Sequence, residues 1–135
     1  MYVREIMTPA PIVCGPHDTV DYAAKLMLNH NVGEIPVCDG AIVIGVVTDR
    51  DITVRATATG KSPMEIEVRA LMTQPVYTAG EFDLIERAAE LMEAQHIRRV
   101  PVVDRNWRLV GILSQTDLAR NGHDRPRKLL PASAA

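Results

Sequence analysis

Aromatic residues are scarce in this sequence, which holds one Phe, one Trp and three Tyr among its 135 residues. Its core must therefore be built from Val, Ile, Leu, Ala and Met, and with 47% hydrophobic residues the chain has enough of them. Neither sign of charge predominates, because the formal net charge is -2. This balance gives no indication of a nucleic-acid partner or of an anionic membrane.

Long apolar runs are missing too. No stretch approaches the roughly 18 to 20 apolar residues that a membrane-spanning helix needs. The N-terminal sequence MYVREIMTPAP has no apolar signal core, so we expect a cytoplasmic protein without a membrane partner. The sequence has no Gly-rich phosphate loop, no HExxH and no GxSxG. We therefore expect a protein that is not an enzyme.

What the sequence does contain is an internal duplication with a period of about 65 residues. The matched positions are Met7-Thr8 with Met72-Thr73, Leu26-Met27 with Leu91-Met92, Pro36-Val37 with Pro101-Val102, Gly45 with Gly111, Thr48 with Ser114, and Asp51 with Asp117. Two copies are too few for a solenoid array. We expect two copies of one supersecondary unit that pack together.

Each copy begins with a short extended piece, at residues 12–13 or 76–78, followed by an amphipathic helix. The apolar residues of these helices recur at helical spacing from Val20 and from Ile85. Asp18 and Asp83 stand where N-cap residues are expected.

A pair of strands and a second helix complete each copy. Asp39-Gly40 lies between two apolar runs and indicates a hairpin, and a helix starts after Thr48 or Ser114. The order is β-α-β-β-α, in which a βαβ crossover makes a parallel strand pair. We expect an α/β (α+β) fold of two such repeats, packed sheet to sheet with pseudo-two-fold symmetry because each sheet leaves one face bare.

The breakers Gly60 and Ser62-Pro63 indicate a linker between the copies. We place repeat 1 at residues 1–59, the linker at 60–67, repeat 2 at 68–120 and a C-terminal tail at 121–135. The tail contains Gly, two Pro and a basic run, so we expect it to be loosely ordered.

Thr48-x-x-Asp51 and Ser114-x-x-Asp117 have two interpretations. Each is nearly a capping box, which stabilises a helix by ~0.5–2 kcal/mol without any ligand. Each can also serve a ligand, because a carboxylate accepts two hydrogen bonds from a vicinal diol. Free N–H groups at a helix start also favour a nearby anion. The two interpretations are compatible.

The doubled Met-Thr and the segments GVVTDRDIT, RRVPVVD and LVGILSQTDL resemble a tandem pair of cystathionine-β-synthase (CBS) domains, called a Bateman module. The resemblance covers about residues 1–120. The short format is similar to free-standing bacterial CBS pairs, including those induced by hypoxia or dormancy.

The resemblance implies a regulatory module that senses AMP, ADP or ATP in clefts between its repeats. With ATP, Mg²⁺ can accompany the nucleotide. In this family the Thr/Ser-x-x-Asp element holds the ribose, which implies that role for Thr48 and Asp51 and for Ser114 and Asp117. The effector protein that reads the signal is not identified by the sequence.

In such a pair, each cleft is closed by residues that precede the second strand of the other repeat. The second repeat offers Arg98 and Arg99 there, whereas the first offers Gly33 and Glu34. Because arginine suits phosphate, we expect unequal clefts, with the Thr48 cleft preferring a phosphorylated nucleoside. A solvated arginine pair at a strand edge is the alternative. The implied base-pocket linings are Val76, Tyr77 and Ile97 in the first cleft and Ile12, Val13 and Val32 in the second.

Cys14 and Cys38 lie at the ends of two strands expected in the first copy. If these strands pair, the cysteines are close enough for a disulfide. The alternative is a pair of small buried residues, since Ala79 and Val103 occupy the matching positions. The Cys and His spacing fits no strong zinc pattern, so we expect no metal.

Bateman modules associate through helix faces, so the resemblance implies a homodimer. The faces around Met27, Leu28, Leu91 and Met92 are the candidates, although core packing also accounts for the Met residues. The alternative function is a ligand-free dimeric interaction or stress-response protein, with a Cys14–Cys38 disulfide as its redox lock.

Overall fold

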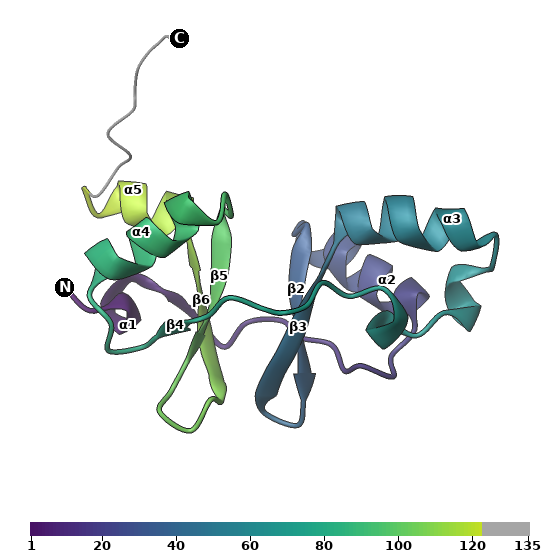
Figure 1. The fold of residues 1–135 in the computed structure, drawn as a ribbon, viewed down its shortest axis with the longest axis horizontal. Coiled ribbons are helices and arrows are strands. Elements are labelled where there is room, and N and C mark those ends of the chain that lie inside the picture. The colour runs from purple at the N-terminus through teal and green to yellow at the C-terminus, as the bar shows by residue number, and fades with distance from the viewer. Residues whose placement is uncertain (123–135) are drawn as a thin grey trace, which may run out of the picture. The chain divides into compact units, whose positions relative to one another are not determined.

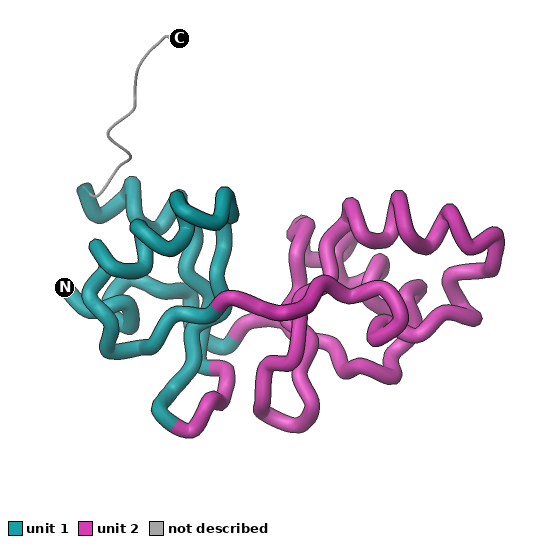
Figure 2. Tube along the Cα trace, in the orientation of Figure 1, with its two compact units in different colours: residues 1–10, 78–105, 110–135 teal, residues 11–77, 106–109 magenta. Residues whose placement is uncertain are grey.

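The computed structural model describes residues 1–122, so the expected tail lies outside the described residues from residue 123 onward. The chain forms two compact units (Figure 2). Among the described residues, unit 1 contains 1–10, 78–105 and 110–122, and unit 2 contains 11–77 and 106–109. The predicted boundaries 1–59, 60–67 and 68–120 describe the duplication in the sequence, and the compact units cut across it.

The leading turn of each sequence copy packs into the unit that is formed mainly by the other copy. In unit 1, the backbone N–H of Val3 donates to the carbonyl oxygen of Asp83 at 2.8 Å. In unit 2, the backbone N–H of Val68 donates to the carbonyl oxygen of Asp18, also at 2.8 Å. Val3 and Val68 are both fully buried. Burial of these apolar turns is therefore what assigns each to the unit formed mainly by the other copy.

Unit 1 contains one sheet with the strand order β1-β6-β5-β4. Its elements are α1 (Val3–Ile6), β1 (Thr8–Pro9), β4 (Ala79–Gly80), α4 (Ile85–Ala94), β5 (Arg99–Val103), β6 (Leu109–Ser114) and α5 (Gln115–Arg120). Strands β4 and β5 are parallel and α4 connects them, which confirms the predicted crossover and the mixed α/β fold. Helices α4 and α5 lie together against the strands (Figure 1).

Unit 2 is built around the antiparallel hairpin of β2 and β3, in which Gly40 adopts φ +63° in the turn, as Asp39-Gly40 predicts. Its elements are α2 (Val20–His30), β2 (Glu34–Asp39), β3 (Ile42–Thr48), the π-helix η1 (Asp51–Ala56), α3 (Thr57–Thr59) and the 3₁₀ turns η2 (Pro63–Glu65) and η3 (Val68–Ala70). The first strand of the copy is reduced to a parallel bridge between Cys14 and Val37. The expected extended pieces at 12–13 and 76–78 therefore precede the observed pairing by one residue each, because pairing begins at Cys14 and Ala79.

The predicted N-caps Asp18 and Asp83 are wrong. Helix α2 begins after Thr19, whose side-chain oxygen accepts from the N–H of Tyr22 at 3.1 Å. The Asp18 carboxylate instead accepts from the N–H of Gly15 at 2.7 Å, and Asp83 makes the equivalent bond in unit 1. These short side chains close the turn before the helix rather than its first turn.

Each unit has its own hydrophobic core. The unit 2 core includes Val20, Ala23, Met27, Ile35, Val37, Val47, Val68 and Leu71, and the unit 1 core includes Val3, Ile6, Ile85, Ala88, Met92, Val100, Val102 and Leu113. The helical spacing from Val20 and Ile85 thus predicts core residues correctly. It fails at Leu28, which is 81% exposed near the end of α2.

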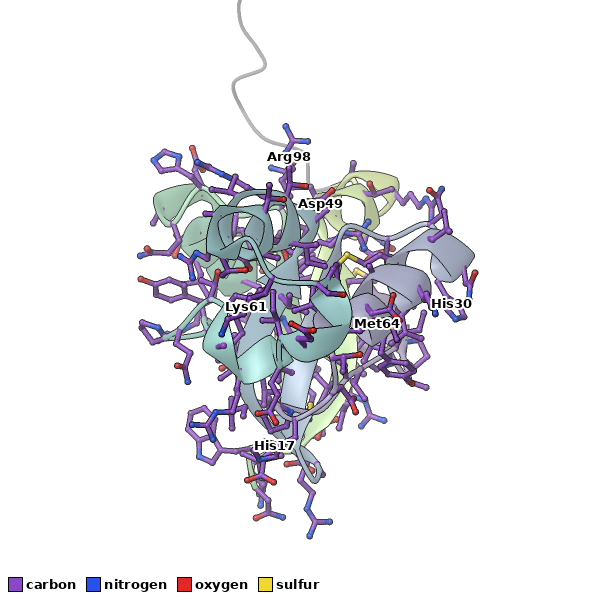
Figure 3. All side chains as sticks on the ribbon, turned by 90° about the vertical axis from the view of Figure 1, so that its right-hand side faces the viewer. His17, His30, Asp49, Lys61, Met64 and Arg98 are labelled. Atoms are coloured by element: carbon purple, nitrogen blue, oxygen red, sulfur yellow. The ribbon has the colours of Figure 1, made fainter. Side chains whose placement is uncertain are left out.

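The units differ on their surfaces at equivalent positions. In unit 2, Nδ1 of His17 lies 3.1 Å from a carboxylate oxygen of Glu67, and Figure 3 shows His17 at the surface. In unit 1, the positions that match them in the duplication hold Phe82 and Tyr2, whose rings meet edge to face at 6.0 Å. The duplication therefore preserves the core while the exposed pairs change from polar to aromatic.

Candidate functional site

Thr48 and Asp51 form a reciprocal capping box where β3 runs into the following helix. The Thr48 hydroxyl oxygen accepts from the N–H of Asp51, and Oδ2 of Asp51 accepts from the N–H of Thr48, each at 3.0 Å. Residues 49–59 are helical throughout, with the π-helix η1 starting at Asp51. The capping interpretation is therefore correct for the first copy.

Ser114 and Asp117 repeat this geometry at the start of α5. Oγ of Ser114 accepts from the N–H of Asp117 at 3.1 Å, and Oδ2 of Asp117 accepts from the N–H of Ser114 at 2.9 Å. The helix that follows is an ordinary α-helix, not a π-helix. The two copies share the cap and differ in the helix that it begins.

The Asp51 carboxylate has further partners that sequence reasoning missed. The hydroxyl of Thr73 donates to it, with oxygen distances of 3.1 Å to Oδ2 and 3.2 Å to Oδ1. Nε of Arg55 lies 3.7 Å from Oδ1. Asp51 is only 6% exposed, whereas Asp117 is half-buried. The one available signal for Thr73 was its place in the duplicated Met-Thr pair.

Val76 and Tyr77, the predicted base-pocket residues of the first cleft, lie in unit 2 together with Thr48 and Asp51. They follow Thr73 closely along the chain, after the cis Gln74-Pro75 peptide bond. Val76 is half-buried and Tyr77 is exposed. The structure thus brings these two residues into the same compact unit as the carboxylate.

Ile97, Arg98 and Arg99 lie in unit 1, so their place opposite Thr48 and Asp51 stays a prediction. Ile97 packs against the unit 1 core, whereas both arginines are exposed, and Figure 3 shows Arg98 at the surface.

The matching of Arg98 with Gly33 in the duplication is confirmed. The Gly33 carbonyl accepts from the N–H of Asp49, and the Arg98 carbonyl accepts from the N–H of Gln115, each at 2.9 Å. Gly33 also packs closely on the Asp49 side chain, since a Cβ atom there would lie 3.0 Å from Oδ2. A side chain at this position would require Asp49 to move.

The residues predicted for the second cleft are also divided between the two units. Ser114 and Asp117 lie in unit 1, and the predicted lining residues Ile12, Val13 and Val32 lie in unit 2. Ile12 and Val32 are half-buried and Val13 is exposed. This grouping of residues also stays a prediction.

Cys14 and Cys38 are free and buried. The N–H of Cys14 donates to the carbonyl oxygen of Pro36 at 3.1 Å, and the N–H of Cys38 donates to the carbonyl oxygen of Cys14 at 2.9 Å. Burial raises the pKa of Cys14 to about 12, with smaller contributions from the charges of Asp18 and Cys38, and burial also raises the pKa of Cys38. Both thiols are therefore protonated at neutral pH, which makes them poor nucleophiles.

Within residues 1–122, no group of three or more His, Cys, Asp or Glu side chains is placed to hold a metal ion. The helices in this part of the chain are also too short or too polar to span a bilayer.

The chain therefore consists of two copies of one βαββα module, and each copy has a capped Thr/Ser-x-x-Asp turn. The family model described as the CBS domain matches residues 3–56 and 68–124, and the chain belongs to this family. It is 40% identical over 119 residues to the CBS domain-containing protein YhcV of Bacillus subtilis, covering 88% of this chain and 84% of YhcV. It is 34% identical to hypoxic response protein 1 of Mycobacterium tuberculosis, covering 87% and 82% of the two chains.

Solved structures show the same fold. The crystal structure of Hypoxic Response Protein I with two coordinated zinc ions matches with a TM-score of 0.81 at 34% identity, covering 90% of this chain and 98% of that one. The CBS domain pair of MJ0100, in complex with 5′-methylthioadenosine and S-adenosyl-L-methionine, matches with a TM-score of 0.78 at 31% identity, covering 90% and 95%. CBSX2 in complex with AMP matches with a TM-score of 0.77 at 29% identity, also covering 90% and 95%.

Proposed function

We propose that this protein is a non-catalytic regulatory module that binds an adenine nucleotide through Thr48 and Asp51. The observation that carries the proposal is the buried Asp51 carboxylate, held by the Thr48 N–H at the end of β3. A carboxylate in a fixed orientation can accept hydrogen bonds from both hydroxyls of a ribose. The related structures with AMP and with S-adenosyl-L-methionine support an adenosine-containing ligand.

Arg98 and Arg99 are the proposed source of phosphate selectivity. Their guanidinium groups are exposed and always charged, and they present paired donors that suit phosphate oxygens. The other predicted cleft has Gly33 and Glu34 at the matching positions, where a carboxylate repels phosphate. The site at Thr48 and Asp51 therefore prefers AMP, ADP or ATP over adenosine, and Mg²⁺ can accompany ATP.

Titration calorimetry with AMP, ATP and adenosine tests this function. Wild-type protein binds AMP at one site more tightly than at any second site. The Arg99→Ala variant loses about tenfold in AMP affinity, since a charge-assisted hydrogen bond is worth roughly 1.5 kcal/mol or more, and keeps its affinity for adenosine. Arg87→Ala, which removes an exposed arginine on α4, is the matched control. Two equal sites, or equal losses for AMP and adenosine, would contradict the proposal.

We propose that the module forms a homodimer through its helices. Met27 and Met92 are part of their own units' cores, and Leu91 is half-buried against the unit 1 core. Leu28 is therefore the one strongly exposed apolar side chain among the four residues predicted for this contact. We propose that the output of nucleotide binding passes through another protein or through oligomerisation.

A second candidate function is favoured by the proximity of Cys14 and Cys38. The 2.9 Å hydrogen bond between their backbones joins neighbouring strand positions, which suits a ligand-free dimeric interaction or stress-response protein with a disulfide lock. A thermal-shift panel of nucleotides separates the two functions, because a ligand that binds only the folded state raises the Tm. Loss of two hydrogens by mass after treatment with oxidised glutathione, without any nucleotide shift, would favour the second function.

A further inference from the structure

The Asp51 carboxylate already has several partners in the structure without a ligand. Its Oδ2 accepts from the backbone N–H of Thr48 at 3.0 Å and lies 3.1 Å from the hydroxyl of Thr73. Its Oδ1 lies 3.2 Å from the same hydroxyl and 3.7 Å from Nε of Arg55. The side chain is 8% exposed, so these groups take the place of water around it.

Thr73 belongs to a segment that is tied to the rest of unit 2 at several points. Its N–H donates to the carbonyl of Val46 at 2.7 Å, and the N–H of Val46 donates back at 3.2 Å. Arg55 donates from Nη1 to the carbonyl of Leu71 at 3.2 Å. The segment runs to Tyr77, and the next residue belongs to unit 1. The Thr73–Asp51 contact therefore anchors one of the stretches of chain that pass from one unit to the other.

A ribose cannot simply be added to this arrangement. An ionised carboxylate offers about four acceptor positions, of which the Thr48 N–H takes one and the Thr73 hydroxyl, within hydrogen-bond distance of both oxygens, covers one on each. One position is left, whereas the two hydroxyls of a ribose need two. The Thr48 N–H belongs to the helix cap, and the Arg55 cation is held by the Leu71 carbonyl as well. The Thr73 hydroxyl is the one neutral side-chain donor of the three, and rotation about its χ1 angle removes it without disturbing the backbone.

We propose that the Thr73 hydroxyl competes with the ligand for Asp51, so that binding a ribose diol displaces it and releases one anchor of the segment between the units. This inference rests on the proposed function, because it assigns Asp51 to the ribose. Thr73 then influences the affinity for the ligand without contacting the ligand. It also gives occupancy of Asp51 a direct route to the connecting segment.

The Thr73→Val substitution tests this proposal, since valine keeps the shape of threonine and removes the hydroxyl. In the free protein, the loss of the hydrogen bond lowers the Tm by about 3 °C. The variant binds AMP about fivefold more tightly by calorimetry, because the ligand no longer has to replace an internal donor. With AMP at saturation, the Tm of the variant equals that of the wild type. A structural role alone would lower both Tm values.

Further variants make the result decisive. Thr73→Ser keeps the hydroxyl and retains wild-type affinity, and Thr73→Ala replaces Thr73→Val if valine disturbs the fold. Thr53→Val removes an exposed hydroxyl from η1 and changes neither the Tm nor the AMP affinity. Wild-type protein that binds no AMP would overturn the proposed function and this inference with it. Wild-type protein that binds AMP, with Thr73→Val equal or weaker in affinity, would overturn this inference alone.

Discussion

Met7 packs so closely on Gly111 that a Cβ atom on this glycine would lie 2.5 Å from the sulfur and 2.9 Å from the carbonyl oxygen of Thr8. The duplicated pair is related in the same way, since a Cβ atom on Gly45 would lie 2.9 Å from the sulfur of Met72 and 3.1 Å from the Thr73 carbonyl oxygen. Thr8-Pro9 pairs with β6, and Thr73 pairs with Val46 of β3. The repeated Met-Thr and the repeated glycine are thus the two sides of one close contact, made once in each unit.

Gly111→Ala should destabilise the protein by about 1–3 kcal/mol, because the backbone of Thr8 limits how far the strand can move. Gly45→Ala should cost less, since its added methyl meets Met72 and Thr73 at longer distances. Urea unfolding of both variants measures the difference. Equal losses, or none, would contradict the close contact.

Gly40→Ala should cost about 1 kcal/mol for a different reason. The residue adopts φ +63° in the β2–β3 turn, and nothing lies within 4 Å of an added Cβ, so the cost comes from the backbone alone. Gly40→Asn, which tolerates this conformation better, should recover part of the loss. Both values come from the same urea measurement, and an Asn variant less stable than the Ala variant would argue against a backbone cause.

Alkaline pH should destabilise the wild type more than Cys14→Ala. The pKa of Cys14 is about 12 in the folded protein because of burial, and an unfolded thiol titrates near pH 8.5. A raised pKa means that the folded state holds its proton more tightly, so this contribution is complete below about pH 8.5 and is lost as pH rises toward 12. The slope of unfolding free energy from pH 8.5 to 10.5 measures it. Identical slopes would exclude the shift.

Leu28→Glu should weaken self-association without weakening the fold. The side chain is 81% exposed on α2, so its replacement removes little from the core. Light scattering coupled to size exclusion should show a shift from dimer to monomer at low micromolar concentration, with the Tm of the monomer fraction nearly unchanged. Tyr22→Glu, at another exposed apolar position on α2, is the comparison. A wild-type protein that is already monomeric would contradict the proposed dimer.

Local patterns predicted much of each unit. The apolar spacing of α2 and α4 identified Val20 and Ile85 as core residues, and Asp39-Gly40 identified the hairpin, because these signals depend on neighbours close in the chain. The N-caps were misplaced, since Asp18 and Asp83 close the preceding turn instead. A short polar side chain before a helix can serve either turn, and the sequence does not distinguish them.

In the candidate site too, one feature was predictable from the sequence and another was not. The reciprocal Thr48–Asp51 cap was predictable from spacing, and it is present. The contact of Asp51 with Thr73 was not, because these residues are far apart in the chain and meet only when the leading turn of the second copy packs into unit 2. Nor does the sequence indicate that Asp51 begins a π-helix while Asp117 belongs to an α-helix.

The amino-acid sequence alone determined the duplication, from residues matched about 65 positions apart. It also determined a helix face, a hairpin and a capped turn in each copy, because each of these depends on spacing over a few residues. Only the tertiary structure decided that each copy gives its leading turn to the other unit. An apolar turn such as that of Val3 or Val68 can be buried against either copy, and the free energy of its burial depends on the complete core that receives it.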